Sequence, residues 1–250
     1  MTVLNPEQPM IASSVTWPVL AHTAKRLNQF AEQSEAVEVK QLTELILDDP
    51  AMAFRLLSDV DSILDRPPTM TTVTSAILLL GIEPFFERYV GLSSVEQTLE
   101  SNPLALQEYR RLVRLSRRAA RLVGAFCVPC HDPDVGGLFL AGLLHALASL
   151  RDCVERPEQV ITAKRTLPDL AETGSILEAA GFPEPFARLI TGDQERLDPQ
   201  MRRVRLAILI ASALENGWSS PELADLLAEL SALLGLSRAG AIELVRSVPV

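Results

Sequence analysis

The residues of this chain that could carry out chemistry are few, and they gather in two neighbouring segments. Cys127, Cys130 and His131 form the sequence CVPCH, whose spacing matches that used for covalent haem attachment. The same three side chains could supply three zinc ligands. A single histidine, His145, then interrupts the apolar run GLFLAGLLHALASL (137–150). It could be a metal ligand, a catalytic base or a polar residue absorbed by the core.

The context of CVPCH favours neither haem nor zinc. Haem attachment of this kind takes place outside the cytoplasm, yet the N-terminus has no basic region followed by an apolar stretch of signal-peptide length. Zinc would need a fourth ligand, and Cys153 stands alone in the sequence. We therefore interpret CVPCHDPDVGG (127–137) as a turn-rich connection between helices and expect no cofactor.

The composition predicts that helices position these residues. The 250 residues are 48% hydrophobic but only 5% aromatic, with 12 glycines, while Leu, Ala and Glu recur throughout. This usage favours helices over the β-branched and aromatic residues of sheets. We find no strand signature and predict an all-α protein built as a multi-helix bundle.

Helix-starting and helix-ending residues indicate where the elements lie. Ser34 is a candidate cap, Pro50 opens a helix, and Thr71 or Thr72 begins one that ends at Gly81. We expect EPFFERYVGLSSVEQTLE (83–100) to continue as one helix. Further helices are predicted from Pro103 to about Phe126 and at 137–150, 169–181, 183–192, 201–217, 221–235 and 238–248.

The segment SNPLAL (101–106) divides the chain, because it brings Ser, Asn and Pro together. We predict a smaller N-terminal helical half, 1–102, and a larger half, 103–250. The larger half begins with the longest regular helix of the chain. Its core seam is predicted to consist of apolar residues that step by three and four, namely Leu112, Leu115, Ala119, Leu122 and Phe126.

The run around His145 resembles the central helix of the HD superfamily. Metal-dependent phosphohydrolases of that superfamily carry adjacent His and Asp residues, commonly as GLLHDIG, whereas here Ala146 follows His145. The resemblance also places Leu115 where active HD enzymes carry an upstream histidine. Neither Leu115 nor Ala146 can ligate a metal. The resemblance therefore implies a degenerate metal site, and we interpret His145 as a core histidine with a local hydrogen-bond partner.

Other motifs resemble the HDOD (HD-related output domain) family. LILDDPAMAFRLLSDVDS (45–62) is similar to the family's DPAL segment and its Asn-Ser pair, with Asp61 before Ser62 in place of Asn. The family's AI..LG helix is matched by Ala76, Ile77, Leu80 and Gly81.

A later stretch, ETGSILEAAGFPEPFARLITGD (172–193), resembles a further HDOD segment. Gly174, Leu177 and Pro183 match it, Ala180 replaces a Trp, and Gly192 and Asp193 stand near where histidines would be. The whole resemblance spans roughly residues 15–235 and implies that the half 103–250 is an HD-like helical subdomain.

Six arginines cluster on the predicted long helix. At ~100° per residue they share an arc of about 120° opposite the leucine seam. The face is either solvated and neutralised by acidic helices of the same chain, or a docking surface for an anionic partner, because arginine binds carboxylate and phosphate bidentately. The six are Arg110, Arg111, Arg114, Arg117, Arg118 and Arg121.

The net charge and the cysteines limit what the protein is expected to bind and where it is expected to act. A net charge of −9 disfavours general nucleic-acid binding, since phosphate contacts need a basic surface. We expect no membrane span, reduced thiols and a cytoplasmic location.

The HDOD resemblance implies a bacterial signalling or regulatory role exercised through binding. We therefore predict a non-catalytic module, not an enzyme, that binds a protein partner in signalling, with a nucleotide as a further candidate ligand. The alternative is an HD-type metal-dependent phosphohydrolase that acts on nucleotides or cyclic dinucleotides, and a bound di-metal centre would distinguish the two.

Overall fold

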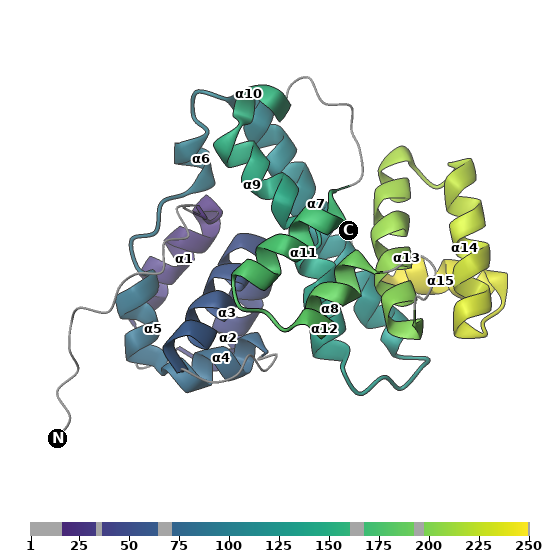
Figure 1. Cartoon of the computed structure of the whole chain (residues 1–250), viewed down its shortest axis with the longest axis horizontal. Helices are drawn as coiled ribbons and strands as arrows, with labels where there is room; N and C mark the ends of the chain where they lie inside the picture. The colour runs from purple at the N-terminus through teal and green to yellow at the C-terminus, as the bar shows by residue number, and fades with distance from the viewer. Residues whose placement is uncertain (1–16, 34–36, 65–71, 161–167, 193–197, 250) are drawn as a thin grey trace.

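The computed structural model describes residues 17–33, 37–64, 72–160, 168–192 and 198–249. These residues form helices joined by short turns and contain no β-strand, so the predicted all-α fold is confirmed (Figure 1). The helices are α1 Ala21–Ala31, α2 Val39–Leu47, α3 Pro50–Leu64, α4 Val73–Leu80, α5 Ile82–Tyr89, α6 Val95–Thr98, α7 Pro103–Cys127, α8 Val135–Leu144, α9 Leu147–Glu155, α10 Pro157–Val160, α11 Leu170–Ala179, α12 Glu184–Thr191, α13 Pro199–Ala213, the 3₁₀ turn η2 Leu214–Asn216, α14 Pro221–Leu234 and α15 Arg238–Ser247.

Several helix ends lie where the sequence predicts them. Pro50 opens α3, and Thr72 caps α4 by accepting a hydrogen bond from the backbone N–H of Ser75 at 3.1 Å. Gly81 ends α4. The other two candidate caps, Ser34 and Thr71, lie outside the described residues.

Two predictions of single helices are wrong. The segment 83–100 forms α5 and α6, because Val90 is extended and Gly91 has a φ of +75°, which favours glycine. The segment 137–150 forms α8 and the start of α9, with a break at His145 and Ala146. The short helices α1, α6 and α10 were not predicted as separate elements.

The long helix α7 is the central element of the fold. It packs against α8, α9 and α13, while α1–α5 lie on one side of the molecule and α13–α15 on the other (Figure 1). Every residue of the predicted seam is buried, from Leu112 to Phe126. The seam is therefore the core-facing side of α7, and the arginines point away from it.

An aromatic chain connects the two predicted halves. The ring centroids of Trp17 and Phe54 lie 4.8 Å apart, those of Phe54 and Phe182 5.8 Å, and those of Phe182 and Phe186 5.5 Å. One hydrophobic cluster contains all four side chains. The helix α7 begins at Pro103 as expected, and the division into two domains at 102 stays a prediction.

One stretch in the described part of the chain, Val135–Glu155, is long and apolar enough to cross a membrane by length and composition. Its most apolar window is 72% buried inside the protein, as in the core helix of a bundle. The stretch also contains the break between α8 and α9. Most of its apolar side chains therefore belong to the core of the protein.

Candidate functional site

His145 is fully buried at the break between α8 and α9. Its Nδ1 lies 2.7 Å from the carbonyl oxygen of Gly142. Because a carbonyl can only accept, Nδ1 carries the proton and donates, which leaves Nε2 unprotonated. Burial lowers the pKa of His145 to about 4, against the opposing effect of the Gly142 hydrogen bond. The imidazole is therefore neutral at physiological pH.

The surroundings of His145 do not fit a metal ion. Leu115 and Ala146 are both buried and apolar, so neither position supplies a ligand. No group of three or more His, Cys, Asp or Glu side chains is placed to hold a metal anywhere in the described ranges. A single imidazole nitrogen is too small a donor set for the two-metal or single-metal activation of water. The two positions at which the resemblance implies missing ligands are thus filled by buried apolar side chains.

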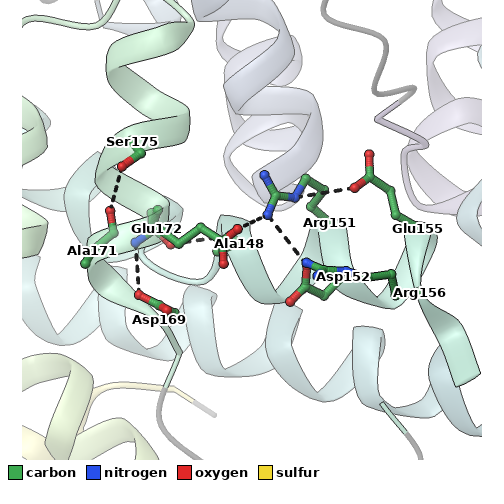
Figure 2. A network of polar contacts seen from close by, with 10 residues as sticks. Ala148, Arg151, Asp152, Glu155, Arg156, Asp169, Ala171, Glu172 and Ser175 are labelled. Atoms are coloured by element: carbon green, nitrogen blue, oxygen red, sulfur yellow. Dashed lines mark hydrogen bonds and ion pairs between the residues drawn. The ribbon is translucent and has the colours of Figure 1, made fainter. Parts of the chain in front are cut away.

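Polar contacts with α11 hold the break in place. The Thr173 hydroxyl donates to the carbonyl of His145 at 3.1 Å and accepts from the N–H of Ala148 at 3.3 Å. Figure 2 shows the adjacent ion-pair network, in which Arg151 of α9 contacts Glu172 of α11. The carbonyl and N–H groups that the break frees are therefore satisfied by a side chain.

The same ion-pair network continues along α9 on the surface. Arg151 also lies 3.7 Å from Asp152 and 3.6 Å from Glu155, and Asp152 pairs in turn with Arg156. These contacts join groups that are all held on α9 or next to it (Figure 2). The ion pairs of Arg151 therefore link α9 to α11.

The CVPCH segment lies at the turn between α7 and α8, as predicted. Cys127 is buried, Cys130 is exposed, and burial raises the pKa of the Cys127 thiol to about 11. The loop is anchored by Asp132, which forms an ion pair with Arg203 of α13 and accepts from Gln200 at 3.0 Å. With one thiol inside the core, the pair is not arranged for attachment to a common cofactor.

Four of the six predicted arginines are used within the chain. Arg111 is buried and pairs with Glu108 and Glu215, so it is not available at the surface. Arg110 lies 3.3 Å from Glu96. Arg117 and Arg121 converge on Asp48 Oδ1, with their nitrogens 3.8 and 3.5 Å away. Most of the arginine face is therefore neutralised by acidic side chains of the same chain, which is the first of the two alternatives that the sequence left open.

The other two arginines are different. Arg114 is exposed and Arg118 half-buried, and neither forms a hydrogen bond or ion pair in the part of the chain that the structure describes. A hollow of about 230 Å³ opens on the same helix at the neighbouring row of Arg117 and Arg121. Its walls are formed by Glu44, Leu47, Asp48, Arg117, Arg121 and Phe139.

Sequence reasoning missed Asp48, the acceptor that organises this face. The two adjacent acids Asp48 and Asp49 have different partners. Asp49 is buried and accepts from the N–H groups of Leu20, Ala51 and Met52. Asp48 is left to face α7. Two adjacent acids before Pro50 were the available signal, since only one of them can cap the helix.

The comparisons with known proteins agree with this architecture. The family model described as HDOD domain matches residues 17–178. The comparison with curated proteins gives no match. The similarity to solved structures shows the fold of the chain.

The chain is similar to two crystal structures of the MmoQ response regulator from Methylococcus capsulatus str. Bath. One is 23% identical with a TM-score of 0.73, over 94% of this chain and 99% of that chain. The other is 22% identical with a TM-score of 0.67, over 95% and 97%. A virulence factor (cj0248) from Campylobacter jejuni subsp. jejuni is 16% identical with a TM-score of 0.60, over 93% of both chains.

Proposed function

Because the chain belongs to the HDOD family, we propose that it is a non-catalytic bacterial signalling module that acts by binding a partner. One observation carries the proposal: His145 is bonded to the backbone of its own helix, and the positions where the HD pattern needs further donors hold the buried apolar residues Leu115 and Ala146. Hydrolysis of the HD type needs several metal donors at that place. The chain offers one neutral imidazole instead.

Two further features support a role in signalling. The fold resembles that of a response regulator over nearly its whole length. The arginine face of α7 offers charge for recognition, while ion pairs of α9 and α13 tie neighbouring segments of the scaffold together. In this proposal the module works in the cytoplasm, its main partner is a protein, and a nucleotide ligand would modulate that binding.

A capture experiment tests the proposal. The purified protein is immobilised and exposed to soluble extract of its own source, with and without added nucleotides and cyclic dinucleotides. We expect specific retention of a protein partner, and equal retention by a His145→Ala variant that remains folded. Turnover of the added nucleotides, instead of binding, would contradict the proposal.

A further inference from the structure

We propose that Arg114 and Arg118 form a carboxylate clamp that docks an acidic peptide segment of a partner protein. The inference rests on the proposed function, because it names the surface through which such a module would bind. The two arginines are four residues apart on α7 and therefore lie one helical turn from each other.

The same helix already contains two arginines at this spacing that share one acid. The nitrogens of Arg117 and Arg121 lie 3.8 and 3.5 Å from one carboxylate oxygen of Asp48, and Arg117 Nε also donates to the backbone carbonyl of Asp48 at 2.5 Å. At ~100° per residue, the row of Arg114 and Arg118 is turned about 60° from that row. The free row thus repeats the spacing of the occupied row without an acid of its own.

The free row lies on an accessible strip of the helix. On one side Arg117 turns towards Asp48, and on the other Arg111 turns towards Glu215. Between them, Arg114 and Arg118 have no partner in the described part of the chain. Like charges at this spacing destabilise a helix, so an incoming carboxylate would relieve repulsion as well as form ion pairs.

The neighbouring hollow defines the rest of the partner. Leu47 and Phe139 give it apolar walls, while Glu44 and Asp48 add negative charge. A phosphodiester chain carries a charge on every unit and would be repelled by these carboxylates. A peptide can place one carboxylate on the arginines and an apolar side chain in the hollow. An acidic, partly apolar peptide therefore fits this surface better than a nucleic acid.

The test uses a defined probe on the whole protein. The probe is a fluorescein-labelled alanine-rich peptide with one Glu and one Leu, and its matched control has Gln in place of the Glu. Binding is followed by fluorescence anisotropy at low and at physiological ionic strength. Arg114→Glu/Arg118→Glu is compared with Arg188→Glu/Arg202→Glu, which changes the net charge equally at exposed arginines of α12 and α13.

We expect salt-sensitive binding of the Glu peptide that Arg114→Glu/Arg118→Glu weakens at least about tenfold. The control pair should weaken it less than about twofold by the general charge effect. The Gln peptide should not bind. The neutral variant Arg114→Gln/Arg118→Gln should show an intermediate loss, which keeps the test independent of how well the reversed-charge variant folds.

The inference is overturned if both charge-reversed pairs weaken binding equally, if the Glu peptide does not bind, or if an oligothymidylate of equal length binds better. A large drop in thermal stability of Arg114→Gln/Arg118→Gln would also overturn it, since the arginines would then serve the fold. These outcomes leave the proposed function standing as long as no nucleotide is hydrolysed.

Discussion

The Nδ1 of His145 lies 2.7 Å from the carbonyl oxygen of Gly142, three residues earlier in the same helix. This bond fixes the tautomer, because Nδ1 donates to the carbonyl and Nε2 is left unprotonated. The break after Leu144 and the buried neutral imidazole form one structural unit. Its properties can be measured without knowing any ligand.

The first prediction concerns pH. Burial holds the pKa of His145 at about 4 in the folded protein, below its ordinary 6.5, so the unfolded chain binds more protons between these values. Stability should therefore fall as pH drops from 6.5 to 4, by about 3 kcal/mol from this residue. Urea unfolding across that range should show a flatter profile for His145→Gln than for the wild type. Equal slopes in the two proteins would refute the assignment.

The second prediction concerns the close approach of α7 and α8. A Cβ on Gly142 would lie 2.8 Å from Cα of Ala120, whereas one on Gly136 of the same helix would meet only Thr72 Cγ2, at 3.5 Å. Gly142→Ala should therefore destabilise the protein by about 1 to 3 kcal/mol or more. Gly136→Ala should be neutral or stabilising, because alanine favours the helix. Thermal unfolding of the two variants decides the matter, and similar midpoints would count against this packing.

The third prediction concerns the anchor of the CVPCH loop. The side chains of Asp132 and Arg203 are 6% and 7% exposed, so removing either one leaves the other charge buried. Asp132→Ala and Arg203→Met should each cost about 3 to 5 kcal/mol. The double variant should cost clearly less than the sum of the two. Strict additivity in denaturant unfolding would show that the two groups do not interact.

The fourth prediction concerns thiol reactivity. Burial raises the pKa of Cys127 to about 11 and that of Cys153 to about 12, whereas Cys130 is exposed. At neutral pH an aromatic disulfide reagent should modify one thiol of the native protein rapidly. All three should react after unfolding. Two fast thiols in the native state would reopen the reading of CVPCH as a reactive pair.

The sequence predicted the elements better than it predicted their contacts. Pro103 and the apolar seam were enough to place α7, because periodicity and a helix-opening proline are local signals. The break at His145 was missed because the apolar run continues on both sides of it. Its cause is Thr173, which lies on another helix and bonds both ends of the break. Likewise, the arc of six arginines could be predicted from the sequence. Which of them pair with Asp48 depends on where the end of α2 lies against α7.

The central claim, that this HDOD chain binds but does not hydrolyse, is tested most directly by a turnover assay. Purified protein is incubated with Mn²⁺ and either nucleoside triphosphates or a cyclic dinucleotide, alongside His145→Ala. The account predicts no turnover above buffer for either protein, and no stoichiometric iron, manganese or zinc retained after dialysis, because Leu115 and Ala146 supply no ligand. Hydrolysis by the wild type that His145→Ala abolishes, in protein that remains folded, would contradict it.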